Sequence, residues 1–330
     1  SFSSRQIQIE SAARLHLGFV DLNGDLGRRF GSLGLAISDL STTVVAQRCA
    51  GFEILGDDAQ PTEKIVTTVL YAFDLPRELS VTVTNGIPTH AGLGSGTQLS
   101  LAVAVAIAEV FDLNADIRDL ARLTGRGQRS GIGIGVFEEG GFVADGGLAS
   151  KTSVPPLLAR FEFPCAWRVI LISDRTQQGL NGASETAVFE SIQPMSRSVA
   201  AELCRLTLMG VFPALVEQDF SAFSTHIAAV QQIIGDHFAP FQGGQFTSPL
   251  VAEAVKWLSR RHTVIGVGQT SWGPTGFAFV EEPAQAAEIC DALVDKFAAS
   301  PSLGFSVHQG RNSGATIEQL QPKANSVAVC

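Results

Sequence analysis

The feature that most constrains the fold is a glycine-rich loop between a strand and a long apolar helix. Residues 87–100 read IPTHAGLGSGTQLS, and they follow the alternating segment LSVTVTN at 79–85. The segment GTQLSLAVAVAIAEVFDL at 96–113 is apolar on nearly every side, which predicts a buried helix. This order places several backbone N–H groups at a helix N-terminus, where the helix dipole favours an anion. We therefore expect a phosphate site at this loop.

The loop contains no lysine, although phosphate loops often use one. Only five lysines occur among the 23 Lys and Arg residues, and none lies in or beside a glycine-rich segment. The glycine spacing is neither that of the P-loop nor that of the dinucleotide fingerprint. We expect arginine to supply any side-chain cation, since its planar guanidinium grips phosphate and carboxylate with two hydrogen bonds. The alternative is a tight turn whose glycines only permit a sharp reversal of the chain.

Charge and hydropathy exclude two classes of partner. The formal net charge of −9 argues against general binding to nucleic acid or to anionic membranes. The N-terminal residues SFSSRQIQIE contain no apolar signal core, and the longest apolar stretch is interrupted at Glu109. We expect a cytoplasmic protein whose partners are small-molecule substrates, with no nucleic acid or membrane, and which forms a homodimer.

Periodicity predicts helices and strands in both halves of the chain. Helices are predicted at 62–75, 114–125, 198–218, 219–238, 248–261 and 282–300, and a strong strand at 167–173. Asn114 or Asp116 would cap the second helix. The segment GVFEEGGFVADGG at 135–147 predicts a strand pair around a glycine turn. A loose stretch at 150–164 divides the chain into domains at 1–160 and 161–330.

Three separated motifs resemble those of the GHMP kinase superfamily, which includes galactokinase, homoserine kinase and mevalonate kinase. They are ARLHLGFVDLNG at 13–24, Pro88-x-x-x-Gly92-Leu93-Gly94-Ser95-Gly96, and GQTSWGPTGFAF at 268–279. The resemblance implies an α+β, GHMP kinase-like two-domain fold. Its N-terminal domain would be of the ribosomal protein S5 domain 2 type and its C-terminal domain ferredoxin-like, with the site in the cleft between them.

The departures from the kinases concern their catalytic groups. In mevalonate-type kinases a Ser-Gly-x-Asp segment supplies an aspartate base, and here the segment is Ser130-Gly131-Ile132-Gly133. The magnesium-binding glutamate of the kinases falls on Arg122 when no gap is allowed. Since phosphoryl transfer depends on these parts, the sequence predicts a poor kinase.

Longer segments resemble one family within the superfamily that is not a kinase, the β-ribofuranosylaminobenzene 5′-phosphate synthases. These segments lie at 13–37, 125–147 and 268–275. The resemblance implies a magnesium-dependent pentosyltransferase of methanopterin biosynthesis. It would join 5-phosphoribosyl 1-pyrophosphate to 4-aminobenzoate and release CO2 and pyrophosphate. The alternatives are a small-molecule kinase that takes its base from Asp21 or Asp145, and a non-catalytic relative that binds sugar phosphates.

The candidate catalytic residues are His90, Arg126 and Arg129. His90 lies inside the loop, and the two arginines would hold pyrophosphate or the aromatic carboxylate. The alternative for the arginines is a solvated helix face shared with Arg118 and Arg122, and whether Arg122 belongs to the site is left open.

The candidate substrate- and phosphate-binding residues come from four segments; the metal ligands are not assigned. They are Arg14, His16, Asp21, Asn23, Gly92, Leu93, Gly94, Ser95, Gly96, Thr97, Gln98, Ser130, Gly131, Ile132, Gly133, Ser271, Trp272 and Gly273. His16 would donate to phosphate, move a proton or fill a structural role. Asp21 and Asn23 would bind ribose hydroxyls or magnesium, or only form a turn. Trp272 would stack on an aromatic ring or pack in the core.

Overall fold

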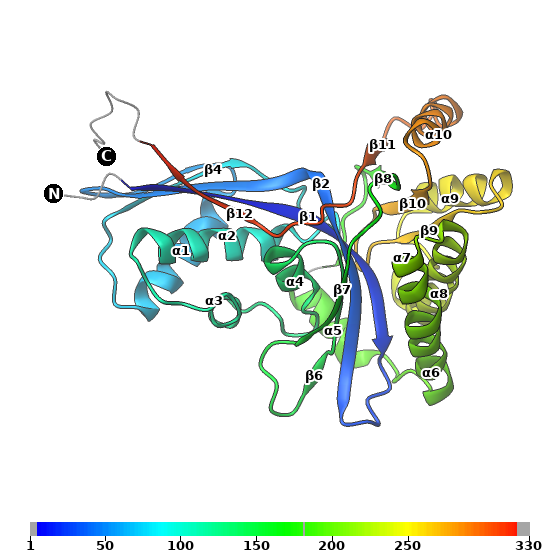
Figure 1. Ribbon diagram of the computed structural model, residues 1–330, viewed down its shortest axis with the longest axis horizontal. Helices are drawn as coiled ribbons and strands as arrows, with labels where there is room; N and C mark the ends of the chain where they lie inside the picture. Colours follow the sequence, from blue (N-terminus) through cyan, green and yellow to red (C-terminus); the bar gives the residue numbers. More distant parts are fainter. Residues whose placement is uncertain (1–4, 181, 322–330) are drawn as a thin grey trace.

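Two β-sheets with their helices form the molecule, and a computed structural model describes residues 5–180 and 182–321 (Figure 1). The first sheet has eight strands, and its main path runs β12-β1-β2-β4-β3. Its long central strands are β1 (Gln6–Asp21) and β2 (Arg28–Arg48), which pair antiparallel. Its other strands are β3 (Phe52–Gly56), β4 (Leu79–Asn85), β5 (Phe142–Asp145), β6 (Leu148–Ala149), β7 (Leu157–Phe161) and β12 (Thr316–Leu320).

The glycine-rich loop leads into α2 (Ser95–Val110), which packs against β1 and β2. Twelve of its 16 residues are buried, as its apolar composition predicts. The predicted helix before it is α1 (Ala59–Ala72), and the predicted helix after it is α3 (Ile117–Leu123). Of the two possible caps of α3, Asp116 is the one observed, because its side chain accepts a hydrogen bond from the Arg118 backbone N–H at 2.8 Å.

The prediction of a strand pair at 135–147 is wrong in its first half. Residues Ile132–Glu138 form helix α4, and only Phe142–Asp145 form a strand, β5. The helix contains two glycines, which propensity disfavours. Its residues Ile132 to Phe137 are nevertheless all buried, and the helix packs between α2 and the first sheet. Tertiary burial therefore overrides the local signal.

The second sheet is antiparallel, with the order β11-β8-β10-β9. Its strands are β8 (Arg168–Asp174), β9 (Gly266–Gln269), β10 (Gly276–Val280) and β11 (Leu303–His308). In chain order this is a 4-1-3-2 arrangement, that of a ferredoxin-like unit. Helices α9 (Pro249–Arg261) and α10 (Pro283–Lys296) share one apolar core with Ile170, Ile172, Ala278 and Val280 of this sheet. The predicted ferredoxin-like half is confirmed.

The remaining helices of the second half are α5 (Gly182–Ser191), α6 (Arg197–Leu206), α7 (Phe212–Glu217) and α8 (Phe220–Gln242). A π-helical turn, Thr207–Val211, joins α6 to α7. The continuous run Arg197–Glu217 is long and apolar enough to cross a membrane by length and composition alone, which the sequence analysis did not anticipate. It packs against α8, and α6 also contacts β1, so that 44% of its most apolar window is buried inside the protein.

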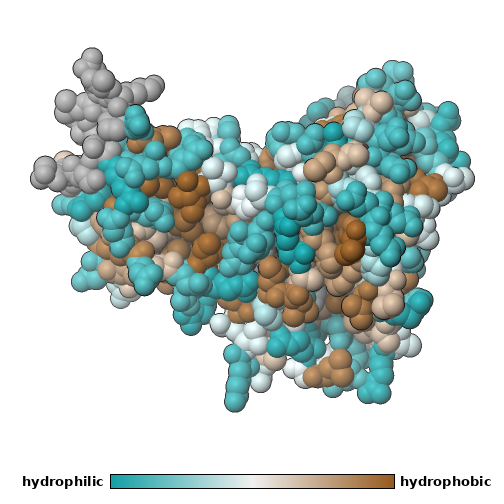
Figure 2. All heavy atoms as spheres, in the orientation of Figure 1, coloured by the Kyte–Doolittle hydropathy of each residue, from teal (hydrophilic) through white to brown (hydrophobic). Residues whose placement is uncertain are grey.

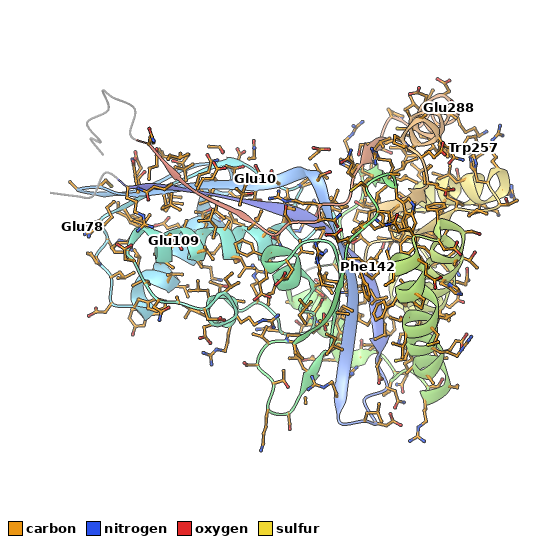
Figure 3. The ribbon with its side chains drawn as sticks, viewed as in Figure 1. Glu10, Glu78, Glu109, Phe142, Trp257 and Glu288 are labelled. Atoms are coloured by element: carbon orange, nitrogen blue, oxygen red, sulfur yellow. The ribbon has the colours of Figure 1, made fainter. Side chains whose placement is uncertain are left out.

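The two halves meet in one aromatic core. Phe142 of β5 lies where they join (Figure 3), and its ring centroid is 6.2 Å from that of Phe223 in α8. Phe163, Trp167 and Phe279 pack around Phe223 in the same cluster. The chain then returns to the first sheet, where β12 pairs with β1. The face seen in Figure 2 is mainly hydrophilic with scattered apolar patches.

Candidate active site

A cavity of about 730 Å³ contains the tip of the glycine-rich loop. Most of the predicted site residues line it, although they come from distant parts of the chain. They are Arg14, His16, His90, Gly92, Leu93, Gly94, Ser95, Gly96, Thr97, Arg126, Arg129, Ser130, Gly133, Ser271 and Trp272. The three motifs, which are far apart in the sequence, therefore contribute residues to one cavity.

Two arginines lie directly against the loop. Gly94, at the N-cap of α2, has φ +82°, and a Cβ built there would lie 3.1 Å from Arg14 Nε. A Cβ on Gly96 would lie 3.1 Å from Arg126 Nη1. The loop glycines thus leave room for both guanidinium groups beside the first N–H groups of α2. Backbone donors and side-chain cations converge on one place, as an anion site requires.

Neither arginine forms a direct ion pair with a carboxylate among the residues that the structure describes, although Glu185 interacts electrostatically with Arg14. Arg14 Nη1 donates to the Gly92 carbonyl at 2.7 Å, while its buried Nε has no partner there. Arg126 Nε donates to Ser100 Oγ at 3.1 Å. Burial lowers the pKa of Arg14 to about 10, a shift that Glu185 partly opposes, so this guanidinium remains charged at neutral pH. Burial also lowers the pKa of Arg126. Buried cations of this kind need an anion to offset their desolvation.

Arg129 is held by α5, a helix that the sequence analysis missed. Its Nη2 lies 3.1 Å from Glu185 Oε2, and its guanidinium carbon lies 5.0 Å from the ring centroid of Phe189. The preceding loop is joined to the glycine-rich loop, since Gly179 N–H donates to the His90 carbonyl at 2.8 Å. The segment QQGLNGASE at 177–185 offers glycines but no periodicity, so only the fold reveals its place in the site.

His16 is buried, and both of its ring nitrogens have partners in the protein. Nδ1 accepts from the Gly18 N–H at 3.2 Å and lies 2.8 Å from Ser271 Oγ. Because Nδ1 accepts, the hydrogen is on Nε2, which donates to Ser130 Oγ at 3.1 Å. Burial, with a smaller contribution from Arg14, holds the pKa of His16 well below 6.5, so the ring is neutral.

The hydrogen-bonded chain continues from Ser130 to the buried Asp145. Ser130 Oγ donates to Asp145 Oδ2 at 3.4 Å, and the Gly131 and Gly147 N–H groups donate to the same carboxylate at 2.8 Å. Burial nevertheless raises the pKa of Asp145. These contacts satisfy His16 and Asp145 internally, so the geometry favours a structural role for both over proton transfer to a substrate.

Gly133, which the sequence resemblance aligns with the kinase base, packs closely against a neighbour. A Cβ on Gly133 would lie 2.8 Å from Thr97 Cγ2, which is closer than real contacts allow. Gln98 is fully buried and donates from Nε2 to the Gly133 carbonyl at 2.8 Å. The methyl group of Thr97 therefore occupies the space that a side chain at residue 133 would need.

Some predicted residues do not line the cavity. Asp21 Oδ1 accepts from the Asn23 and Gly24 N–H groups, and Asn23 Nδ2 donates to the Met195 carbonyl at 2.7 Å. This is the turn role that the sequence analysis left open. Arg122 pairs with Asp119 on an exposed surface, outside the cavity. Gln98, Gly131, Ile132 and Gly273 do not line the cavity, but each is next in the chain to a residue that does.

The acidic residues of the cavity offer little to a metal ion. Asp58 and Glu185 line it, and Glu185 is paired with Arg129. Across the described ranges no three His, Cys, Asp or Glu residues come close enough to hold a metal. Phe19, Leu180 and Trp272 add apolar surface at one side of the cavity. The site can thus bind a strongly anionic group beside an apolar one.

Comparison with known proteins identifies this arrangement. Residues 62–138 match the family model of the GHMP kinases N terminal domain, and residues 211–299 match that of the GHMP kinases C terminal. The beta-ribofuranosylphenol 5′-phosphate synthase of Archaeoglobus fulgidus is 32% identical over 94% of this chain and 99% of its own. The synthase of the same name from Methanothermobacter thermautotrophicus is 30% identical over 84% of this chain and 89% of its own.

A solved structure shows the same fold. The crystal structure of a mevalonate 5-diphosphate decarboxylase superposes with a TM-score of 0.67 over 98% of both chains, at 14% sequence identity. At that identity the likeness concerns the fold alone. It confirms the predicted GHMP kinase-like architecture.

Proposed function

The chain belongs to the GHMP kinase superfamily and, within it, to the family of the beta-ribofuranosylphenol 5′-phosphate synthases, and from this premise we propose that it is a decarboxylating phosphoribosyltransferase. The observation that carries the proposal is the pair Gly133 and Thr97. The resemblance to mevalonate-type kinases places their base at residue 133, which here is a glycine packed against the Thr97 methyl group. Arg14 and Arg126, which form no direct ion pair in the described chain, lie against the loop. The site combines groups that bind an anion with a glycine at the position of the kinase base.

The proposed donor is 5-phosphoribosyl 1-pyrophosphate. Its pyrophosphate would bind the N–H groups at the start of α2 together with Arg14 and Arg126. The C1–O bond to pyrophosphate breaks, and the bond's electron pair leaves with the pyrophosphate. The guanidinium groups stabilise the charge that develops on this leaving group, which is catalysis by electrostatics and positioning.

The proposed acceptor is a benzoate with an electron-donating group opposite its carboxylate. The ring carbon that carries the carboxylate attacks C1, and loss of CO2 returns an electron pair to the ring and restores its aromaticity. The resemblance in sequence implies 4-aminobenzoate as the acceptor, whereas the relatives are named for a ribofuranosylphenol product. Both the amino and the hydroxyl group can donate electrons to the ring, and the apolar side of the cavity, with Phe19 and Trp272, suits either acid.

Magnesium is part of the proposal through the substrate. Because Asp58 and Glu185 are the carboxylates that line the cavity, the pyrophosphate oxygens would be the main ligands of the ion. Bound there, Mg²⁺ would neutralise charge on the leaving group. The cytoplasmic location and the homodimer stay predictions.

The decisive experiment traces the carboxyl carbon of the acceptor into CO2. Purified protein is given Mg²⁺, 5-phosphoribosyl 1-pyrophosphate and 4-aminobenzoate or 4-hydroxybenzoate, each labelled at the carboxyl carbon. We expect labelled CO2 and pyrophosphate in equal amounts with at least one of the two acids. Pyrophosphate without CO2 would indicate hydrolysis and contradict the proposal. Steady transfer of phosphate from ATP to a small alcohol would favour the kinase instead.

A further inference from the structure

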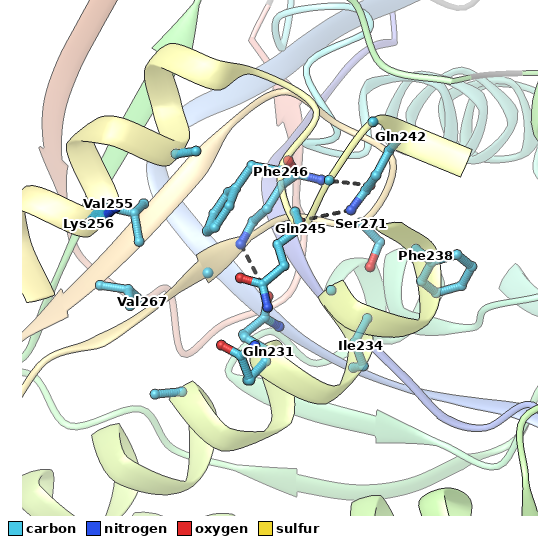
Figure 4. A pocket seen from close by; sticks show the side chains of 18 of the residues that line it. Gln231, Ile234, Phe238, Gln242, Gln245, Phe246, Val255, Lys256, Val267 and Ser271 are labelled. Carbon is cyan, nitrogen blue, oxygen red and sulfur yellow. Dashed lines mark hydrogen bonds between the residues drawn. The ribbon is translucent and has the colours of Figure 1, made fainter. Parts of the chain in front are cut away.

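A second cavity of about 730 Å³ lies beside the candidate active site (Figure 4), between α8, α9 and β9. We name it the amide cavity after Gln231, Gln242, Gln245 and Gln269, which line it together with the exposed Gln232. Its apolar walls include Ile234, Phe238, Phe246, Val255 and Val267. It shares two lining residues, Ser271 and Trp272, with the active-site cavity. A cavity volume of this order is typical of sites that bind small molecules.

The four side-chain amides are oriented by hydrogen bonds. Gln269 donates from its backbone N–H to Gln231 Oε1 at 3.1 Å and from Nε2 to Gln242 Oε1 at 3.3 Å. Gln242 Nε2 donates to the Gln245 carbonyl at 2.9 Å. Each bond determines which end of the amide is nitrogen and which is oxygen. The polar groups of the cavity are therefore arranged before any ligand binds.

These amides retain hydrogen-bonding capacity. In the described part of the chain, the side-chain nitrogens of Gln231, Gln242, Gln245 and Gln269 each donate one hydrogen bond. An amide nitrogen carries two hydrogens, and an amide oxygen accepts twice. Each side-chain nitrogen thus has a second hydrogen that these bonds do not use, and Gln231, Gln242 and Gln245 are drawn around the cavity in Figure 4.

The charge of the cavity differs from that of the active site. Among the residues that the structure describes, no carboxylate lines it and its single cation is the exposed Lys256, whereas three arginines line the active-site cavity. Uncharged donors and acceptors above apolar walls suit a flat ring that is itself neutral. We propose that the amide cavity binds a neutral planar heterocycle with a ring-amide edge, the chemistry of a nucleobase, and that the ligand acts on the active site through Ser271 and Trp272.

The route to the active site consists of direct contacts. Trp272 has φ +59°, a strained conformation for this residue, and its buried Nε1 has no partner in the described chain. Its ring is 4.5 Å from Phe238 in the amide cavity and 5.2 Å from Phe189, over which Arg129 lies. Ser271 contacts His16 on the other side. A ligand that shifts Ser271 and Trp272 therefore changes the positions of the His16 and Arg129 side chains in the active-site cavity.

The test measures binding to the full chain without turnover, so it does not depend on the proposed reaction. Inosine is the probe, because it is neutral and presents a ring-amide edge. We expect one molecule to bind per chain and to change the tryptophan emission, including in Trp257→Phe. Gly235→Phe should weaken inosine at least tenfold and leave pyrophosphate binding within twofold. Gly235 lines only the amide cavity, and a Cβ there meets Gln245 at an ordinary 3.4 Å.

Gln242→Leu is the second variant, since it removes one amide from the chain of hydrogen bonds without filling the cavity. We expect it to weaken inosine several-fold. The proposal is overturned if inosine does not bind the wild-type protein, or if it binds both variants as tightly as the wild type. Competition between inosine and pyrophosphate that persists in Gly235→Phe would place the nucleoside in the active-site cavity and would equally overturn it.

Discussion

Arg14 and Arg126 lie behind the glycine-rich loop, without a carboxylate partner among the described residues. Desolvation lowers the pKa of each guanidinium, and that of Arg14, at about 10, still leaves it charged at neutral pH. The glycine-rich loop, which contains no lysine, thus gains its cations when the first strand and the segment after α3 fold against it. The two guanidinium groups lie in space that side chains at Gly94 and Gly96 would otherwise occupy.

The first prediction concerns Arg126. Arg126→Ala should weaken 5-phosphoribosyl 1-pyrophosphate by about 1.5–3 kcal/mol, the range for a hydrogen bond to a charged group. Isothermal titration calorimetry measures the change. Arg122→Ala is the matched control, because Arg122 is an exposed arginine of the preceding helix that pairs with Asp119. If both variants bound 5-phosphoribosyl 1-pyrophosphate with the same affinity, Arg126 would not be a ligand of this substrate.

The second prediction concerns His16, whose folded pKa lies below 6.5. As the pH falls below about 6.5, the unfolded chain takes up the proton first, so folding stability should fall by up to about 1.4 kcal/mol per pH unit from this group. Asp145 has the opposite sign, since its folded pKa is raised and it loses stabilisation as the pH rises above 3.8. Its contribution is present in both proteins and cancels in the comparison below.

Urea unfolding of the wild type and His16→Gln at about pH 7.5 and about pH 5.5 tests this prediction. The wild type should lose more stability than the variant on acidification. The pKa values of His237, His262 and His308 are lowered as well, and their contributions are common to both proteins. Parallel loss in the two proteins would mean that His16 titrates normally in the folded state.

At the scale of elements, α3 and α4 show how local signals succeed and fail. Helix α3 has an acidic cap at Asp116 and the left-handed Gly125 just beyond its end, which are short-range signals for a helix. Helix α4 has Gly131 at its N-cap and glycines inside, and it forms because its side chains are buried against the first sheet. The first helix is therefore readable from its own residues, and the second is not.

The third prediction tests the cap of α3. Asp116→Ala should destabilise the protein by about 1 kcal/mol, because the Arg118 N–H loses its acceptor. Asn114→Ala serves as the control and should have little effect, since Asn114 lies before the observed cap. Urea unfolding monitored by circular dichroism measures both. A larger loss in Asn114→Ala would reverse the assignment.

At the scale of the whole molecule, one aromatic core joins the two sheets. Phe223 of α8 is fully buried and packs against Phe142 of the first sheet and Phe279 of the second. The active-site cavity is likewise lined by residues of both halves, from Arg14 to Trp272. The position of the site therefore depends on how the halves pack against each other.

The fourth prediction follows from that core. Phe223→Ala should cost about 3–5 kcal/mol, the range for removing a buried aromatic side chain. Because the cluster belongs to both halves, we expect one unfolding transition in the wild type and in the variant. Differential scanning calorimetry measures this. Two separate transitions in the wild type would show that the halves fold independently.

The sequence by itself determined the parts of this protein that depend on neighbouring residues. The strand, glycine loop and helix around residues 79–110 are as predicted. Helices also occupy the four long segments predicted in the second half, although a π-helical turn at Thr207–Val211 interrupts the first of them. The order of the three motifs was sufficient to predict the superfamily and its architecture. Periodicity and glycine spacing are local signals that involve residues close together in the chain. For that reason a single sequence is enough to recognise them.

Only the tertiary structure decided which side chains meet. His16 and Ser271 are 255 residues apart in the chain, and their contact, together with that of Ser130, turns a candidate proton donor into a satisfied structural residue. The pairing of Arg129 with Glu185 and the packing of Thr97 into the space at Gly133 are equally non-local. Such contacts depend on the packing of whole elements, because burial rather than local propensity selects them. No short pattern of residues encodes that packing.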